Sequence, residues 1–470
     1  MTQGRLARWL HLAHRWLGVG LGLMALLWFV SGLVMLFVAR PQLDQTERLA
    51  ALPVLDPAGV RVTPAAAWQA LGLPGQPQAI RLNAADGRPA YRILAGQHWH
   101  AVDAATGAEL PAPDAEAARR LVQALADGHE VARVAAVEVD QWTVYRRFDA
   151  LRPFWRVELG DGRHFYVSTR SGEIALDTST AERAWNWLGS VTHWIYVTPL
   201  RQNTPLWRNV VLWASFLALA LTATGFWLGW QRLRIKRRYS GGRMTPYRDP
   251  WKRWHLLAGM ASTLILLGWL LSGWLSMAPF GLASGPQRIV GNTLPAIATL
   301  GALPQPAPDS RELEWSGLGG HALRVDRQAQ GSRIVIDGQS AQDSLTLADI
   351  DQALQAIPGI TIARIAWQAE ADSRYYALRH HPRTFPVVRV ELGDEAATVL
   401  YISPRSGHVA HTSNRHDFAQ RWLYQGLHRL DFPYLAARPL LRDALIIVLS
   451  LLGIGFCLTG CRLAWSRLVR

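Results

Sequence analysis

Four long apolar stretches without Asp, Glu, Lys or Arg divide the chain. They are Leu17–Val38, Val210–Trp230, Leu256–Phe280 and Ala444–Cys461. A helix needs about 20 apolar residues to cross the hydrocarbon layer of a membrane. The pattern therefore predicts four membrane crossings and excludes a soluble protein. A fifth uncharged run, Ile289–Pro308, is rich in proline, which breaks helices, so we expect a loop there.

The basic residues orient these crossings. The chain of 470 residues carries 49 Lys and Arg against 35 Asp and Glu, a net charge of +14. The whole excess lies in residues 1–16, 231–255 and 462–470, which hold 15 basic residues and one acidic residue. Because Lys and Arg gather on the cytoplasmic side of membrane proteins, the pattern predicts that both termini and the middle loop are cytoplasmic. The charge then requires no nucleic-acid partner.

The chain also contains an internal repeat. A shift of 241 residues superimposes the first apolar stretch on the third, and a shift of 235 superimposes the second on the fourth. The matched pairs are His14 with His255, Ser31-Gly32 with Ser272-Gly273, His193 with His428, and Thr224-Gly225 with Thr459-Gly460. Each half is expected to run helix, outer domain, helix in the same orientation. A pseudo-two-fold axis along the membrane normal should then relate the halves.

The two outer segments have the pattern of small α+β units. Helical periodicity at 115–126 and 346–356 precedes alternating runs at 153–159 and 386–392. This order predicts a helix packed on an antiparallel sheet in each unit, with extra short strands at 77–110 in the first. Neither unit shows a nucleophile motif, a Gly-rich phosphate loop or a Cys/His metal-binding spacing.

Three segments resemble a known protein family. They are His14-Arg-Trp-Leu-Gly18, Leu188…His193 and Tyr401-Ile-Ser-Pro-Arg-Ser-Gly407, and they are similar to the PepSY-associated transmembrane proteins of bacterial inner membranes. The likeness covers nearly the whole chain. The resemblance implies periplasmic PepSY domains between membrane helices. Some members of the family are haem-containing ferric-siderophore reductases.

The expected fold is therefore an α-helical bundle of four membrane helices with two periplasmic α+β PepSY-like domains, produced by duplication. The predicted parts are 1–40, the N-terminal cytoplasmic end and first crossing; 41–181, the first PepSY-like domain; 182–230, an interfacial segment and the second crossing; 231–255, the basic cytoplasmic loop; 256–280, the third crossing; 281–415, the second PepSY-like domain; and 416–470, an interfacial segment, the fourth crossing and the cytoplasmic C-terminus.

Four of the fifteen histidines occupy matching positions beside the apolar stretches. His14 and His255 are expected at the cytoplasmic edge of the bilayer, and His193 and His428 on its outer side. The two-fold axis would set the members of each pair at equal depth, facing one another. Opposed neutral imidazoles can supply both axial bonds of a haem iron. We therefore predict two haem b groups, one near each bilayer face, with these four histidines as the axial iron ligands.

Basic residues and glycines surround the inner pair. We expect Arg15, Arg253 and Lys252 to bind haem propionates through charge-assisted hydrogen bonds. Small residues allow close approach to a membrane helix, which a porphyrin requires. The glycines concerned are Gly18, Gly20, Gly22 and Gly259.

The histidines also have a plainer interpretation. A histidine at a membrane edge can simply lie among lipid headgroups, like the tryptophans beside it. His11 is an alternative to His14, but its repeat partner is Lys252, so we place it second. Pro199 and Pro205 follow His193, and the depth of the outer pair stays open for that reason.

Two functions of different classes follow. In the first, electrons from a cytoplasmic or quinol donor pass from the His14/His255 haem to the His193/His428 haem and reduce a periplasmic acceptor. The resemblance implies ferric siderophore iron as that acceptor, because reduction to Fe(II) weakens its binding by hard oxygen ligands. In the second, a non-enzymatic membrane protein uses its PepSY units to bind or regulate a periplasmic protein or peptide. Membrane lipid is a partner in both, and nucleic acid in neither.

Overall fold

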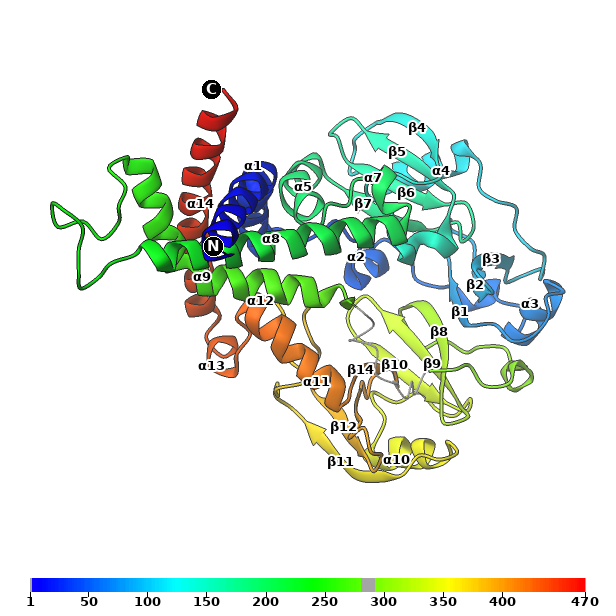
Figure 1. The fold of residues 1–470 in the computed structure, drawn as a ribbon. Coiled ribbons are helices and arrows are strands. Elements are labelled where there is room, and N and C mark those ends of the chain that lie inside the picture. The colour runs from blue at the N-terminus through cyan, green and yellow to red at the C-terminus, as the bar shows by residue number, and fades with distance from the viewer. Residues whose placement is uncertain (1, 280–291, 470) are drawn as a thin grey trace. The chain divides into compact units, whose positions relative to one another are not determined.

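The computed structural model describes residues 2–279 and 292–469 (Figure 1). They form two compact units. Of the described residues, the helical unit comprises 2–40, 181–279 and 416–469, and the sheet unit comprises 41–180 and 292–415. Phe280, the predicted domain boundary at 281 and the start of the Ile289–Pro308 run lie outside the described residues.

Among the described residues, four helices of the helical unit are long and apolar enough to cross a membrane. They are α1 (Thr2–Phe37), α8 (Thr204–Arg232), α9 (Pro250–Ser276) and α14 (Pro439–Leu468). Each one begins before the apolar stretch predicted for it. The four predicted crossings are therefore present as helices, with longer N-terminal ends than hydropathy indicates.

Caps and prolines explain where two of these helices begin. The Asn203 side chain accepts a hydrogen bond from the Leu206 N–H at 3.0 Å, and proline stands in the first turn of α8. Asp249 accepts from the Trp251 N–H at 2.8 Å, and Pro250 opens α9. A capping oxygen satisfies an N–H that has no partner within the helix, and proline lacks that N–H altogether. Both signals lie outside the apolar stretches.

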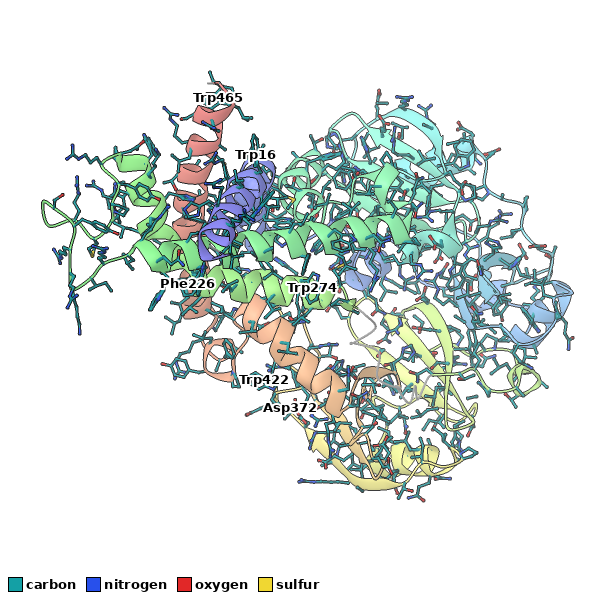
Figure 2. The ribbon with its side chains drawn as sticks, viewed as in Figure 1. Trp16, Phe226, Trp274, Asp372, Trp422 and Trp465 are labelled. Carbon is teal, nitrogen blue, oxygen red and sulfur yellow. The ribbon has the colours of Figure 1, made fainter. Side chains whose placement is uncertain are left out.

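The four long helices form a bundle in which α1 and α9 stand opposite each other. α1 packs against α8 and α14, and α9 packs against the same two helices. The serines Ser31 on α1 and Ser272 on α9 are fully buried. The outward surface instead carries large exposed aromatic residues, of which Figure 2 labels Trp16, Phe226 and Trp465. Small polar residues inside and apolar residues outside are typical of a bundle surrounded by lipid.

A chain of short helical segments precedes both α8 and α14, in the same order. The first comprises α5 (Thr180–Asn186), a π-helical turn (Trp187–Val191), α6 (Thr192–Trp194) and α7 (Thr198–Arg201). The second comprises α11 (Arg415–Arg421), a π-helical turn (Trp422–Gly426), α12 (Leu427–Arg429) and α13 (Pro433–Ala436). Ile195 and Leu430, with φ of 51° and 54°, end α6 and α12 in the left-handed conformation. These turns fix the positions of the two preceding helices, which carry His193 and His428.

The described part of the sheet unit contains three antiparallel sheets. One has the order β4-β5-β6-β7 (Val131–Val137, Phe154–Leu159, His164–Ser168, Ile174–Thr178). A second has the order β11-β12-β13-β14 (Ile362–Gln368, Val387–Leu392, Val399–Ile402, Val409–Ser413). The third has the order β10-β9-β8-β1-β2-β3 (Ser332–Ile336, His321–Gln328, Ser310–Leu318, Ala79–Asn83, Ala90–Ala95, His98–Asp103).

Helices cover these sheets. α4 (Ala115–Gln123) packs on β4 and β5, and α10 (Leu347–Gln355) packs on β11. The remaining helices of the unit are α2 (Gln45–Ala50) and α3 (Pro64–Ala70), with 3-10 turns at Pro57–Gly59, Arg146–Leu151 and Ile297–Leu300. The predicted helices, the alternating strands and the extra strands of the first segment are thus confirmed. The duplication of the chain stays a prediction.

The six-stranded sheet joins the two outer segments through the antiparallel pairing of β1 with β8, a contact that the sequence did not indicate. A buried polar cluster crosses this pairing. Arg48 donates two hydrogen bonds to the Glu312 carboxylate, at 2.5 and 2.6 Å, and Asn83 donates one at 2.9 Å. Burial alone would raise the pKa of Glu312, but the hydrogen bonds from Arg48 and the charges of Arg81 and Arg48 lower it to about 2. Glu312 therefore stays ionised in the folded sheet.

We predict that Glu312→Gln destabilises the sheet unit by about 3 kcal/mol, because it removes one partner of a buried ion pair. The wild-type stabilisation should be complete above the unfolded-state pKa, near 4.5, and should fall as pH drops toward 2. Melting temperatures of the detergent-solubilised chain between pH 3 and 7 test this. Glu116→Gln, at an exposed position, is the control. Equal melting temperatures for Glu312→Gln and Glu116→Gln would contradict the prediction.

Candidate functional site

The structure brings together the two histidines of the predicted inner pair. His14 lies on α1 and His255 on α9, the two opposite helices of the bundle. The centres of their imidazole rings are 6.3 Å apart, and the ring planes are inclined at 48°. His14 and His255 thus face each other inside the bundle, although 241 residues separate them in the chain.

The predicted outer pair is also brought together. His193 lies on α6, which packs against α1, and His428 lies on α12, which packs against α9. Their ring centres are 6.1 Å apart, with the planes inclined at 70°. The two pairs therefore have nearly the same spacing, although one is carried by long helices and the other by short ones.

This spacing suits one metal ion between two imidazoles. A metal–nitrogen bond to imidazole is about 2.0–2.1 Å long, and a ring nitrogen lies about 1.1 Å from its ring centre. Two such bonds in line separate the ring centres by about 6 Å. The rings are too far apart for direct stacking, and no hydrogen bond joins them within the described residues.

Each of the four rings makes its hydrogen bond through Nδ1. Nδ1 of His14 lies 3.2 Å from the Leu221 carbonyl oxygen, and Nδ1 of His255 lies 3.0 Å from the Thr459 hydroxyl. In the outer pair, Nδ1 of His193 lies 3.1 Å from the Ser31 hydroxyl, and His428 makes the same contact with Ser272, also at 3.1 Å. All four Nδ1 atoms thus contact an oxygen on a neighbouring helix.

The hydroxyl groups determine which ring nitrogen carries the proton. Ser31 donates its own proton to the Trp28 carbonyl at 3.2 Å, and Ser272 donates to the Trp269 carbonyl at 3.0 Å. Thr459 likewise donates to the Phe456 carbonyl at 2.6 Å. A hydroxyl that has donated its single proton can only accept from the imidazole. The histidines are therefore protonated at Nδ1, and Nε2 keeps its lone pair for a ligand, as in metal-binding histidines.

A glycine lies against each imidazole. A Cβ added to Gly225 would come within 2.7 Å of Cε1 of His14, and one added to Gly460 would come within 3.3 Å of Cε1 of His255. The corresponding distances are 3.3 Å between Gly32 and His193 and 3.5 Å between Gly273 and His428. Each glycine follows a Ser or Thr in the chain. The four dipeptides Ser31-Gly32, Ser272-Gly273, Thr224-Gly225 and Thr459-Gly460 thus form a small cradle for each ring.

Burial keeps the outer imidazoles neutral. It lowers the pKa of both His193 and His428 to about 4. A neutral imidazole is the form that binds a metal. The stacking of Tyr424 on His428, with ring centres 5.2 Å apart, shields that ring further.

Aromatic residues fill the bundle between the two pairs. Ser31, which contacts His193 of the outer pair, lies 17 positions after His14 on α1. A helical rise of about 1.5 Å per residue then separates the two pairs by about 25 Å along the helix. Phe29 lies in this interval against Trp269, with ring centres 5.6 Å apart, and Phe456 stacks on His255 at 5.0 Å. Phe29 belongs to a buried apolar cluster with Leu266 and Cys457. The centre of the bundle is thus packed with apolar groups between its histidine pairs.

Other predicted site residues are not members of the two imidazole pairs. Arg15 is exposed and Arg253 is half-buried, and their binding of propionates stays a prediction. His11 lies beside Arg232, which also contacts Tyr247, and does not join either pair. In the part of the chain that the structure describes, no group of three or more His, Cys, Asp or Glu side chains is arranged to hold a metal ion.

The glycines that contact the imidazoles are not those expected to make room for a porphyrin, and that role of Gly18, Gly20, Gly22 and Gly259 stays a prediction. Gly20 has no atom within 4 Å of an added Cβ, and a Cβ on Gly259 would meet Phe456 at 2.9 Å rather than a histidine. The sequence did contain the relevant signal. The Ser-Gly and Thr-Gly dipeptides recur in both halves, but sequence repetition alone does not indicate that they contact imidazoles.

One protein-family model matches nearly the whole chain. The family model of the PepSY-associated TM region matches residues 11–467. None of the curated proteins matches the chain. Together with the four long apolar helices, the family match shows a multi-pass membrane protein.

We predict that the packing between the histidine pairs is intolerant of added volume. A Cβ at Gly453 would fall 2.2 Å from Cε1 of Phe29, whereas one at Gly455, on the same helix, meets nothing within 4 Å. Gly453→Ala should cost about 1–3 kcal/mol through overpacking, and Gly455→Ala should be neutral or slightly stabilising, since alanine favours the helix. Thermal unfolding of both variants in detergent measures the difference. Equal stabilities would show that Phe29 does not pack on α14 in this way.

Proposed function

The chain belongs to the family of PepSY-associated transmembrane proteins, and on that basis we propose that it is a di-haem b electron-transfer protein of the bacterial inner membrane. The observation that carries the proposal is the two imidazole pairs, His14 with His255 and His193 with His428, with ring centres 6.3 and 6.1 Å apart. In both pairs the hydrogen bonds at Nδ1 leave Nε2 for a ligand.

The protein would hold each haem through its own side chains. Haem, when bound, would supply reversible one-electron chemistry, and its iron would be held by His14 with His255 and by His193 with His428. The hydroxyls of Ser31, Ser272 and Thr459 orient the imidazoles, and the glycines beside them leave room for the rings. The exposed Arg15 and half-buried Arg253 are the residues proposed for the propionates of the inner haem.

The direction of transfer follows from the proposed topology. The basic segments favour a cytoplasmic position for both termini and the 231–255 loop. Two periplasmic PepSY-like domains, related by the duplication, would then lie on the side of His193 and His428. We propose a cytoplasmic or quinol donor on the inner side and ferric siderophore iron as the periplasmic acceptor. Reduction to Fe(II) weakens the hold of hard oxygen ligands on the iron and releases it.

We predict that each single histidine substitution removes one haem, and that the two histidines of one pair remove the same haem. His14→Ala and His255→Ala should each reduce the haem content from two to one per chain and abolish the same spectroscopic component. His193→Ala and His428→Ala should each remove the other component. Haem content and low-temperature absorption spectra of the purified variants measure this.

His11→Ala is the matched control, because His11 lies on the same helix as His14 but outside both pairs. It should keep two haems. Loss of both haems from every single variant, with helical content preserved, would contradict the assignment of separate pairs.

The proposed reaction requires a direct test. Protein reduced anaerobically with dithionite, freed of excess reductant and mixed with a ferric hydroxamate siderophore should be reoxidised while an Fe(II)-specific chelator develops colour. His193→Ala should lose this reaction, since it removes the haem on the acceptor side. Reoxidation without Fe(II) formation, or no reoxidation, would refute the siderophore as the acceptor.

The alternative function is a membrane protein without haem that binds or regulates a periplasmic protein or peptide through its sheets. The two functions differ in a simple property. A protein purified from cells with ample haem supply should be red if the first is correct. A colourless protein with an intact fold would favour the second.

A further inference from the structure

The sheet unit contains a cavity of about 200 Å³ whose lining is rich in arginine. It lies between the β1–β2 loop, strands β2 and β3, α4 with the segment that precedes it, and the end of β6 with the segment that joins it to β7. The charged residues that line it are Asp86, Arg88, Arg92, Asp114, Arg120 and Arg170. Four guanidinium groups thus face two carboxylates, and the cavity has an excess of positive charge.

Arg92 is the unusual member of this lining. The residue is only 1% exposed, and its Nε and Nη2 atoms are buried without a hydrogen-bond partner. The nearest carboxylate oxygen, on Asp86, is 3.8 Å away, and Asp86 lies closer to Arg88, at 3.2 Å. A buried guanidinium without hydrogen bonds is costly, because its lost hydration is not replaced.

Other acidic groups near Arg92 are already engaged. Glu173 accepts hydrogen bonds from Arg81 at 2.6 Å and from Asn83 at 2.8 Å. Asp114 caps α4 by accepting from the Ala117 N–H at 2.7 Å. Neither carboxylate therefore supplies the missing partner of Arg92.

The second outer segment shows that the fold itself does not require an arginine here. Gly172 and Gly407 end the matching sequences Tyr166–Gly172 and Tyr401–Gly407. The atom nearest to a Cβ added at Gly172 is Nη1 of Arg92, at 3.7 Å, whereas at Gly407 it is Cδ1 of Leu323, at 2.2 Å. Leu323 belongs to a continuous apolar core. A leucine thus occupies in one segment the place of Arg92 in the other, where the buried guanidinium has one long ion pair with Asp86, at 3.8 Å, and no hydrogen bond at Nε or Nη2.

We propose that this cavity binds a small organic anion through a carboxylate or phosphate group, with Arg92 at its base as the principal ligand. A guanidinium presents parallel N–H donors that match the two oxygens of such a group. Arg88, Arg120 and Arg170, which are exposed, stand at the rim and bind further negative charge. The volume suits a molecule the size of a di- or tricarboxylate or a small phosphate ester, below the usual range of drug-sized ligands.

Calorimetric titration of the purified full-length protein tests the proposal. The probes are citrate, inorganic phosphate and acetate at constant ionic strength. The effect of each probe on the melting temperature of the protein is measured as well. We expect saturable binding of citrate or phosphate and a rise in melting temperature, with acetate weaker. Preference for citrate assigns an organic carboxylate as the natural ligand, and preference for phosphate assigns a phosphate compound. Absence of saturable binding of all three at millimolar concentrations would overturn the proposal.

The decisive variant is Arg92→Leu, which installs the side chain found at Leu323. It should weaken anion binding at least about tenfold, as expected for the loss of a charge-assisted pair. Without anion its melting temperature should equal or exceed that of the wild type, since the variant removes a buried charge whose ion pair with Asp86 is long, at 3.8 Å. A lower melting temperature with unchanged anion binding would show that Arg92 serves the fold alone.

Arg170→Gln provides a second measurement that does not depend on a buried position. It should weaken binding by several-fold while leaving the melting temperature without anion unchanged, because Arg170 is exposed. Arg333→Leu, at a half-exposed arginine outside the cavity, is the matched control and should bind the anion as the wild type does. If Arg333→Leu and Arg170→Gln weakened anion binding equally, the loss of affinity would follow from the change in net charge alone, and this result would overturn the assigned site.

Discussion

The hydrogen bond at Nδ1 of each imidazole is the interaction on which the helical unit depends. It fixes the orientation of His255 through Thr459 and of His193 through Ser31. In each ring Nε2, the nitrogen opposite Nδ1, then takes no part in this hydrogen bond. Because each hydroxyl donates its only proton to a carbonyl of its own helix, it must accept a hydrogen bond from the imidazole, so the imidazole proton lies on Nδ1. A hydroxyl and a glycine side by side on a helix thus hold the rings of His193, His255 and His428, whereas at His14 the Leu221 carbonyl takes the place of the hydroxyl.

Close approach of the helices makes this arrangement possible. The imidazoles of His14 and His255 occupy space that any side chain at Gly225 or Gly460 would fill. The same residues keep α8 and α14 near the histidines of α1 and α9. The apolar packing around Phe29 then separates the two pairs along the bundle. The orientation of the imidazoles and the close packing of the helices therefore depend on each other, and the proposed redox function requires both.

The sequence predicted the periodic features well and the long-range contacts poorly. Hydropathy indicated the four long helices, and alternation indicated strands such as Phe154–Leu159. The predicted repeat indicated which histidines face each other. It did not indicate the pairing of β1 with β8 or the Arg48–Glu312 contact, because side chains far apart in the chain decide these. Local patterns report the period of an element, whereas partners at a distance leave no local pattern.

Haem uptake by the purified chain tests the central claim most directly. Haem added in steps to protein depleted of the cofactor should saturate at two equivalents, with the low-spin absorption and electron paramagnetic resonance signals of iron bound by two histidines. Saturation at two low-spin haems is the result that the imidazole spacings of 6.3 and 6.1 Å predict. Absence of saturable uptake, or five-coordinate high-spin iron at both sites, would contradict the account.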